Sequence, residues 1–461
     1  MRDYQPRYSS RASSSYFCLT TIPPPLQQPR FIPMCDLIKL DVGYQNYAWG
    51  KDAASSFVAK MKGLTNDKSG KMFAELWVGT HPSCPSKIAD GNAQLLEDFL
   101  KEPENKKKYF SEAHQATDFR DTVPYLLKVL SIRTALSIQA HPCKKLAEEL
   151  HAAKPDKYKD PNHKPELICA LTTFEALCCF RPLGAIMAYL KCIPELAELV
   201  GADAVLGKYM VAPETELPAS DSDAEKALLK AMMTNLYAVS EDIVTKALRL
   251  HLQRIEEKGA QCAEDELFAR VYSQYPDDVG CWMVYFLNYV QMLPGEALFL
   301  SDSEPHAYVS GDGVEIMACS DNVVRAGLTP KWKDVSTLIS MLKYDTTGLA
   351  SARHEKKSSE DAAHWQVQYY QPPAQFPDFS LYRLQYEEAS GNGTTSVTLP
   401  TIGLGFCLEG SVKVNGTTLI AGDCFAVPYG KMTCEADGSK ALVFVASTND
   451  LSDRKSSSRE N

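Results

Sequence analysis

Residues 137–142 read Ser-Ile-Gln-Ala-His-Pro, a run that places an amide and an imidazole two positions apart on an expected β-strand. Side chains at i and i+2 of a strand point to the same face, so Gln139 and His141 can reach one point in a cavity. Taken alone, such a pair is more often a solvated edge than a metal site, because most histidines bind no metal. The pair becomes a metal half-site only if other ligands join it.

Two later segments supply ligands of suitable chemistry. Residues 161–166 read Pro-Asn-His-Lys-Pro-Glu, and residues 304–308 read Glu-Pro-His-Ala-Tyr. A carboxylate from the first and an imidazole from the second would complete a set of one amide oxygen, one carboxylate and two ring nitrogens. That set suits a borderline divalent ion such as zinc, with room for water or a substrate oxygen. The expected ligands are Gln139, His141, Glu166 and His306.

The composition restricts the class of protein. The chain has 461 residues, of which 45% are hydrophobic and 23% charged, as expected for a soluble globular protein of two or three domains. The net charge of −10 argues against a nucleic-acid partner but permits a local basic pocket for an anionic substrate. No run of 18 apolar residues predicts a membrane span. The 14 cysteines form no C-x-x-C pair, which favours free thiols in a reducing compartment.

The hydrophobic pattern changes twice along the chain. Short β-rich runs and turns from 37 to about 180 predict a β-sandwich or barrel, with a helix at 143–151. From 183 to 293, apolar residues follow helical spacing. Gly259 predicts the end of one helix, and the helical spacing continues from Val279 to Val290. Strand patterns then resume, and Pro-Gly-Glu at 294–296 followed by Pro-His at 305–306 resembles a cupin motif. We expect a mainly β fold of two cupin-like β jelly rolls with an inserted α-helical domain.

The domain boundaries follow from these changes in pattern. The first 36 residues are rich in Arg and Ser and poor in acids, as in a transit peptide, but a Pro run interrupts any helix there and Met34 offers an alternative start. In the last β segment, Met432 and Thr433 stand where a cupin histidine would be expected. Glycine pairs at 311–313 and 391–393 predict turns between strands. The expected parts are a disordered extension at 1–36, a catalytic β domain at 37–182 and 294–347, an inserted helical domain at 183–293, a metal-free β domain at 348–451 and a disordered tail at 452–461.

Six short segments, taken together in their order along the chain, indicate a family more strongly than any one of them alone. They read Tyr-Gln-Asn-Tyr-Ala-Trp-Gly at 44–50, Glu-Leu-Trp-Val-Gly-Thr-His-Pro-Ser at 75–83, Gln-Ala-His-Pro at 139–142, Asn-His-Lys-Pro-Glu at 162–166, Pro-His-Ala-Tyr at 305–308 and Ser-Asp-Asn-Val-Val-Arg-Ala-Gly-Leu-Thr-Pro-Lys at 320–331. The chain closely resembles the type I mannose-6-phosphate isomerases from about residue 37 to about residue 449. The resemblance implies one zinc ion per chain, held by the four expected ligands.

The resemblance also implies roles for other residues. Arg325 is similar to an arginine regarded as essential in the family, and with Lys331 it would bind phosphate, although charges on a loop are ordinarily just solvated. Lys164 would bind substrate oxygens or act as an acid, and the general base stays open between Glu315 and Asp321. The residues expected to line the pocket are Trp49, Ser137 and Tyr308.

The implied reaction is the interconversion of mannose 6-phosphate and fructose 6-phosphate by proton transfer through an enediolate. Zinc would stabilise the negative charge that develops on oxygen. We expect a cytoplasmic monomer that feeds GDP-mannose and glycoconjugate synthesis, with a phosphosugar substrate, no nucleic acid and no membrane partner. Two alternatives stay open: an iron-dependent cupin dioxygenase, which would consume oxygen, and a sugar-binding protein without turnover. The cations around the expected site argue against both.

Overall fold

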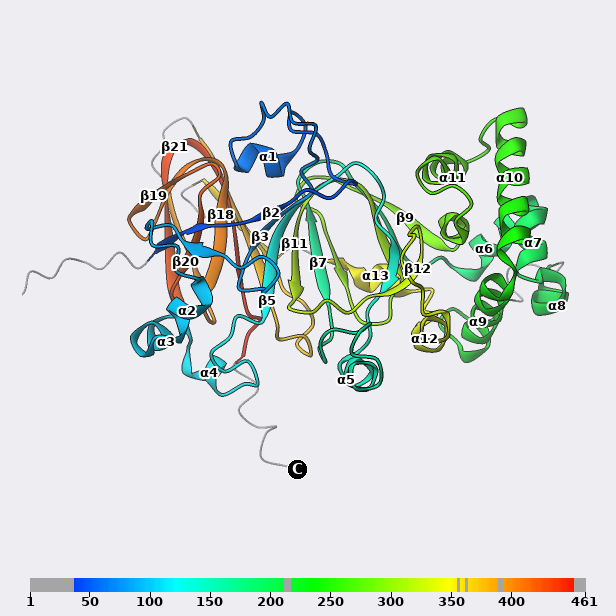
Figure 1. The fold of residues 1–461 in the computed structure, drawn as a ribbon, viewed down its shortest axis with the longest axis horizontal. Coiled ribbons are helices and arrows are strands. Elements are labelled where there is room, and N and C mark those ends of the chain that lie inside the picture. The colour runs from blue at the N-terminus through cyan, green and yellow to red at the C-terminus, as the bar shows by residue number, and fades with distance from the viewer. Residues whose placement is uncertain (1–36, 211–216, 355–356, 361–363, 389–392, 452–461) are drawn as a thin grey trace, which may run out of the picture. The chain divides into compact units, whose positions relative to one another are not determined.

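The computed structural model describes residues 37–210, 217–354, 357–360, 364–388 and 393–451. This part of the chain contains two large antiparallel sheets, and a group of helices is inserted between strands of the first (Figure 1). The mainly β fold with an inserted helical region, predicted from the sequence, is confirmed. The expected extension at 1–36 and the tail at 452–461 lie outside the described residues.

The first sheet carries the expected metal ligands. Its 11 strands are β2 (Tyr44–Gln45), β3 (Glu75–Val78), β5 (Tyr125–Ile132), β6 (Ile138–Ala140), β7 (Glu166–Ala170), β8 (Phe174–Phe180), β9 (Leu287–Met292), β10 (Ala297–Leu300), β11 (His306–Ala318), β12 (Val324–Gly327) and β13 (Arg353–His354). The main path runs β13-β10-β7-β11-β5-β3-β2, and β6, β8, β9 and β12 join at its side. Strand β5 is buried at every position, which explains its nearly continuous apolar sequence.

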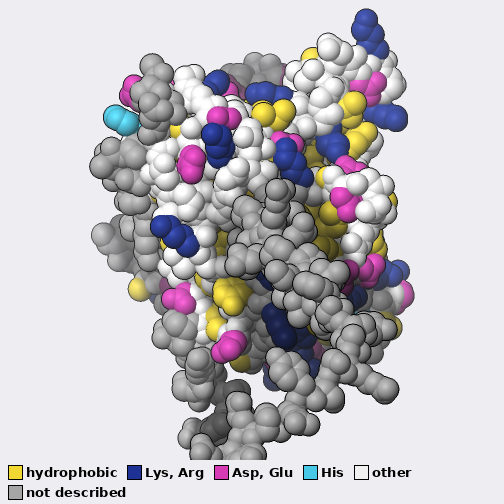
Figure 2. Space-filling model, turned by 90° about the vertical axis from the view of Figure 1, so that its left-hand side faces the viewer, with side chains coloured by type: hydrophobic (Ala, Val, Ile, Leu, Met, Phe, Trp, Pro, Cys, Tyr) yellow, Lys and Arg dark blue, Asp and Glu magenta, His cyan; other side chains and the backbone are white. Residues whose placement is uncertain are grey.

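The second sheet has ten strands. They are β1 (Ile38–Asp41), β4 (Lys87–Ile88), β14 (Lys357–Glu360), β15 (Trp365–Tyr370), β16 (Ser380–Glu387), β17 (Thr394–Leu399), β18 (Gly403–Val414), β19 (Thr417–Ile420), β20 (Cys424–Val427) and β21 (Gly430–Ser447). Strand β1 pairs with β20, so the first described strand completes the sheet built mainly by the C-terminal part. On the face seen in Figure 2, acidic and basic side chains are interspersed.

Most helices belong to the inserted region. In chain order, the helices are α1 (Phe57–Met61), α2 (Leu96–Lys101), α3 (Pro103–Tyr109), α4 (Glu112–Gln115), α5 (Lys144–Ala153), α6 (Leu183–Cys192), α7 (Pro194–Leu199), α8 (Ala202–Leu206), the 3₁₀ helix η1 (Gly207–Met210), α9 (Asp223–Ala238), α10 (Glu241–Lys258), α11 (Ala263–Gln274), the 3₁₀ helix η3 (Val279–Tyr285), α12 (Val335–Met341) and α13 (Gly348–Ala352). Helix α5 confirms the helix expected at 143–151. Gly259 caps α10 with φ of 76°, as expected of a helix stop. No helix in the described part is long and apolar enough to cross a membrane.

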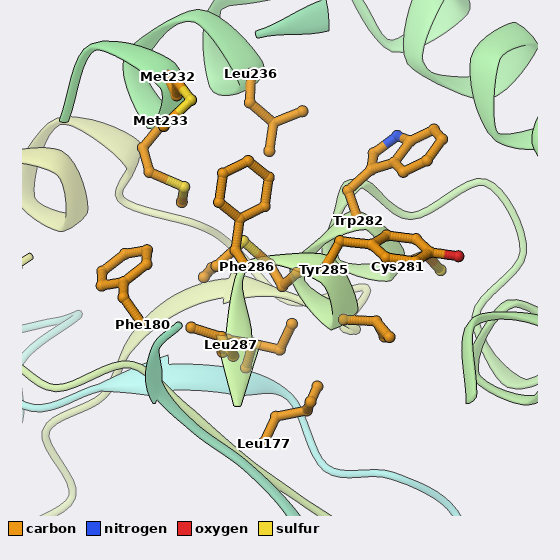
Figure 3. Packing of buried hydrophobic residues seen from close by; sticks show 14 of the residues in the cluster. Leu177, Phe180, Met232, Met233, Leu236, Cys281, Trp282, Tyr285, Phe286 and Leu287 are labelled. Atoms are coloured by element: carbon orange, nitrogen blue, oxygen red, sulfur yellow. The ribbon is translucent and has the colours of Figure 1, made fainter. Parts of the chain in front are cut away.

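The inserted helices and the first sheet share one apolar core. Around η3, Phe286 lies among Met233 and Leu236 of α9 and Phe180 of β8, while Leu287 points towards Leu177 (Figure 3). All six side chains are 0% exposed. Because the core is continuous, the backbone around η3 is held firmly against the sheet.

The helical spacing expected from Val279 to Val290 is wrong in its second half. Residues 279–285 form η3, but Leu287–Met292 is strand β9, paired with β8 in the register Ala176↔Val290. Its two leading apolar residues, Leu287 and Val290, are three positions apart, a spacing that also fits one face of a helix. The pairing partner, which lies more than a hundred positions earlier, decides between them.

The turn expected at 311–313 is also wrong. Gly311 and Gly313 lie inside the long strand β11, beyond an irregularity between Tyr308 and Ser310. At Gly311 the φ is 119°, and a Cβ atom would come within 2.8 Å of the Phe174 Cα atom. The glycine is therefore required by close packing against the start of β8 and not by a turn. The second expected turn, at 391–393, has Gly391 and Asn392 outside the described residues.

Candidate metal site and substrate pocket

Three buried side chains that could hold a metal ion converge in the first sheet. His141 directly follows β6, Glu166 begins β7 and His306 begins β11. One ligand atom from each lies within 4.8 Å of the others, and all three residues are at most 1% exposed. The pairing of β6 with β11 joins segments that are far apart in the sequence. The structure thus brings together three of the four expected ligands.

Hydrogen bonds orient both imidazoles towards the same point. The Nδ1 atom of His141 is 2.8 Å from the carbonyl oxygen of Asn322, and that of His306 is 3.0 Å from the carbonyl oxygen of Glu304. Each Nδ1–H group can donate to its carbonyl, which leaves the Nε2 lone pair free. Both Nε2 atoms are buried without a hydrogen-bond partner, 3.4 Å from the oxygens of Glu166. Such orphaned acceptors around a carboxylate fit a divalent metal ion.

The protonation states also suit metal binding. Burial lowers the pKa of His141 to about 4, so its imidazole is neutral at physiological pH. Burial alone would raise the pKa of Glu166, but the ammonium of Lys164 and the two imidazoles outweigh it and hold that pKa well below its usual value. The Lys164 Nζ atom is 3.2 Å from Glu166 Oε1. A neutral imidazole and an ionised carboxylate are the forms that coordinate a metal.

Gln139 is close to this cluster in the sheet. It pairs with His306 of β11 on one side and with Arg325 of β12 on the other. Its side chain is half-buried. This position is consistent with a fourth ligand, which stays a prediction.

A cavity of about 780 Å³ opens next to the cluster. Six of the residues expected to bind or convert the substrate line it: Trp49, Ser137, Lys164, Asp321, Arg325 and Lys331. Burial lowers the pKa of the Arg325 guanidinium, which still stays charged. A hydrogen bond with His81 lowers the pKa of the Asp321 carboxyl, so this group is ionised at neutral pH. The cavity therefore presents two kinds of group, cations for an anion and a carboxylate that can accept a proton.

Two expected residues are not part of the cavity wall. Tyr308 is 2% exposed, and its hydroxyl donates to Glu166 Oε2 at 3.5 Å. Glu315 is 4% exposed, and burial raises the pKa of its carboxyl. Tyr308 is therefore placed to orient a metal ligand, and Glu315 lies below the wall of the cavity.

Sequence reasoning missed a cross-strand row that includes Glu315. Lys128 of β5 pairs in register with Trp77 of β3 and with Glu315 of β11. Its Nζ atom is 3.0 Å from Glu315, 3.5 Å from Glu75 and 5.1 Å from the centre of the Trp77 ring. Burial opposes the charge of Lys128, but the two carboxylates outweigh it and raise its pKa. The available signal was the lone charge inside the apolar run Tyr-Leu-Leu-Lys-Val-Leu-Ser-Ile at 125–132.

Lys128, Glu75, Trp77 and His81 line the cavity beside the expected residues. Glu75, Trp77 and His81 lie within residues 75–83, one of the six segments that carry the family resemblance. The sequence analysis gave these three residues no role. Glu75 and Trp77 face the same side of β3 because they are two positions apart. The Trp77 indole donates to Glu75 at 2.5 Å, which fixes both side chains.

The chain matches models of known families in two stretches. Residues 37–183 match the catalytic domain of type I phosphomannose isomerase, and residues 208–287 match its helical insertion domain. Mannose-6-phosphate isomerase of Rattus norvegicus is 39% identical over 374 residues, which are 78% of this chain and 83% of the rat protein. The enzyme of Homo sapiens is also 39% identical, over 77% of this chain and 82% of the human protein.

Two solved structures share the fold, the first of them from Salmonella typhimurium. The mannose 6-phosphate isomerase bound to the substrate F6P and a zinc atom superposes with a TM-score of 0.73 at 27% identity, over 90% of this chain and all of that chain. A zinc-bound form of mannose 6-phosphate isomerase gives a TM-score of 0.72 at the same identity.

Two jelly-roll sheets, a buried His-Glu-His cluster and a cavity with cations define a metal-binding protein of the cupin type. The matches narrow this class. The chain belongs to the family of type I mannose-6-phosphate isomerases, and the resemblance inferred from its six sequence segments is confirmed.

Proposed function

We propose that the chain interconverts mannose 6-phosphate and fructose 6-phosphate as a zinc-dependent isomerase. The observation that carries this proposal is a cavity lined by cations, one of which, Lys164, contacts Glu166 of the buried cluster, where two imidazole Nε2 atoms have no hydrogen-bond partner. Zinc at His141, Glu166 and His306, with Gln139 as the fourth ligand, supplies a Lewis acid for the negative charge of an enediolate. One zinc ion per chain satisfies this cluster.

The phosphate group of the substrate needs cations away from the reacting carbons. Arg325 and Lys331 lie in one segment and both line the cavity. Arginine can hold an oxyanion through two parallel hydrogen bonds, and lysine contributes a point charge. We assign the phosphate to these two residues, with Trp49 and Ser137 beside the sugar.

The reaction moves a proton between neighbouring carbons, so it needs a group that accepts and returns that proton. Of the three expected carriers, Lys164 and Asp321 line the cavity, whereas Glu315 is paired with Lys128 below it. Asp321 is ionised and half-exposed, which suits an acceptor, and Lys164 beside Glu166 suits a donor to substrate oxygen. We therefore assign proton transfer to Lys164 and Asp321, with Glu315 holding Lys128 in place.

We also propose an oligomeric state, a compartment and a metabolic role for the chain. A cytoplasmic monomer would supply mannose 6-phosphate for GDP-mannose and glycoconjugate synthesis, or return mannose to fructose 6-phosphate. Size measurement in solution tests the monomer, and labelling of the full chain in cells tests the compartment.

The first experiment measures fructose 6-phosphate formed from mannose 6-phosphate by the full chain before chelation, after chelation and after zinc is restored. We expect activity that disappears with the metal and returns with zinc. A folded, zinc-loaded chain without turnover would contradict the isomerase and leave a sugar-binding protein as the better description.

Arg325→Ala then tests the assignment of the phosphate site. Loss of one charge-assisted contact of about 3 kcal/mol predicts a fall of roughly a hundredfold in kcat/KM with zinc retained. Metal content is measured on the same sample. An unchanged kcat/KM would remove Arg325 from the site.

A further inference from the structure

Asp278 joins the inserted helical region to one wall of the cavity. Asp278 is the N-cap residue of η3, and its Oδ1 atom accepts from the backbone N–H of Gly280 at 2.7 Å. The same oxygen accepts from the N–H of Leu328 at 2.8 Å, and Oδ2 accepts from the N–H of Thr329 at 3.2 Å. One carboxylate therefore binds three N–H groups, two of them in the loop at 328–331, which lines the cavity and ends at Lys331.

The backbone of this loop needs such support. Leu328 has φ of 54°, in the left-handed region that a leucine rarely occupies. A residue keeps such a conformation only where its surroundings hold it, and functional loops are a common place for it. The hydrogen bond from the Leu328 N–H to Asp278 holds the strained residue, and the Thr329 hydroxyl then accepts from the Lys331 N–H at 3.1 Å. The position of Lys331 thus depends on Asp278.

The two backbones meet without side chains between them. A Cβ atom on Gly280 would lie 2.6 Å from the Leu328 nitrogen, and one on Gly327 would lie 2.5 Å from the Gly280 Cα atom. Nearby, the Tyr237 hydroxyl of α9 donates to the Ala326 carbonyl at 2.7 Å. Behind this contact, η3 is packed into the apolar core shown in Figure 3. The inserted region therefore offers a rigid platform to the loop.

The same segment also contacts the neighbouring part of the cavity wall, just before β6, which pairs with β12. Gln274 Oε1 accepts from the Ala135 N–H at 2.9 Å, and the Tyr275 hydroxyl donates to the Ala135 carbonyl at 2.6 Å. Both Gln274 and Tyr275 line the cavity, as does Ser137, two residues after Ala135. A stretch of seven residues at 274–280 thus contacts two neighbouring parts of the cavity wall, the backbone at Ala135 and the loop at 328–331.

We propose that Asp278 is a positioning residue for phosphate binding, which fixes the 328–331 loop and so places Lys331 against the phosphate of the substrate. This inference rests on the proposed function for the identity of the substrate. Asp278 does not line the cavity, and its carboxylate accepts from the N–H groups of the loop and of η3, with the Lys333 Nζ atom 3.8 Å away. Its effect should therefore appear in substrate affinity and act through Lys331.

The test compares Asp278→Ala, Asp278→Asn, Lys331→Ala and the double variant Asp278→Ala with Lys331→Ala. We expect Asp278→Ala to raise the KM for mannose 6-phosphate by about fivefold, no more than the loss of Lys331 itself, with kcat changed less than about twofold and zinc retained. Asparagine keeps one acceptor oxygen for the N–H groups of Gly280 and Leu328, so Asp278→Asn should restore part of the affinity. In the Lys331→Ala background, loss of Asp278 should add less than about twofold, because both changes remove the same contact.

Ser222→Ala is the matched control. Ser222 caps α9 by accepting from the Glu225 N–H, as Asp278 caps η3, but it does not line the cavity. We expect an unchanged KM for this variant. Gly280→Ala is a second way to displace the loop, and it should raise KM through steric contact while Asp278 is intact.

Binding of inorganic phosphate, measured by calorimetry on the zinc-loaded chain, separates this inference from the proposed function. We expect weaker phosphate binding by Asp278→Ala than by the unchanged protein. Absence of turnover by the unchanged protein would overturn the isomerase, while the phosphate titration would still decide the role of Asp278. An unchanged KM and phosphate affinity in Asp278→Ala, or full additivity with Lys331→Ala, would overturn the inference.

Discussion

The two sheets have related jelly-roll architectures but opposite interiors. Inside the first sheet, His141, Glu166, His306 and the charged Lys128 are buried together. The described interior of the second sheet is a cluster of apolar side chains that includes Phe425 and other residues of β18 to β21. The difference shows that the sheet architecture supplies strand ends at fixed positions, while the side chains on them decide between a site and a packed core.

The largest effect should come from removing a ligand in the first sheet. His141→Ala should release the metal and lower turnover by about a thousandfold or more, since Lewis-acid stabilisation is worth several kcal/mol. Metal content and initial rate are measured together. His364→Ala, at an exposed histidine, is the control and should leave both unchanged. Normal metal content with a normal rate in His141→Ala would contradict the site.

The second largest effect is expected for the buried Lys128, whose replacement should lower the stability of the fold as well as the activity. Lys128→Met leaves the carboxylates of Glu75 and Glu315 buried together without their cation. Breaking a buried ion pair in this way costs about 4 kcal/mol of unfolding free energy. Urea unfolding at pH 7 measures it. The double variant with Glu315→Gln should recover part of the loss, and a single variant as stable as the unchanged chain would mean that the row is not a structural unit.

A core residue of the second sheet should separate stability from activity. Leu419→Ala removes a fully buried side chain of β19 and should lower the unfolding free energy by about 3 kcal/mol. Because no described residue of the second sheet belongs to the His141, Glu166 and His306 cluster, kcat/KM of the folded protein should stay the same. A change in kcat/KM without a change in metal content would show that the second sheet influences the site.

The smallest effect is expected for one exposed cation of the cavity. Lys331→Ala should raise KM by about fivefold to tenfold, because a solvated charge contributes roughly 1 kcal/mol. The difference from the unchanged protein should shrink in high salt, which screens exposed charges. Lys431→Ala on β21 is the control. If Lys431→Ala lowered the affinity equally, the effect of Lys331→Ala would come from the change in net charge and not from a contact with the substrate.

The sequence predicted the mainly β fold with its inserted helices, and it predicted a set of site residues of which three expected ligands converge in the structure. The ligand residues lie in short segments whose local order is informative, and the structure brings His141, Glu166 and His306 together. The strand β9 was taken for helix because its apolar residues Leu287 and Val290 continue the helical spacing of the residues before them. Glycines at 311–313 were taken for a turn because close packing against β8 leaves no signal in the local sequence.

The sequence by itself determined the chemistry: which side chains can bind a metal, which can bind an anion, and where β patterns give way to helical ones. Tertiary structure decided which of these groups meet. It placed Lys128 between Glu75 and Glu315, added β1 to the second sheet and brought Asp278 of the inserted region to the loop at 328–331. These contacts join residues 50 to 388 positions apart, and their pairing depends on packing that no local pattern records.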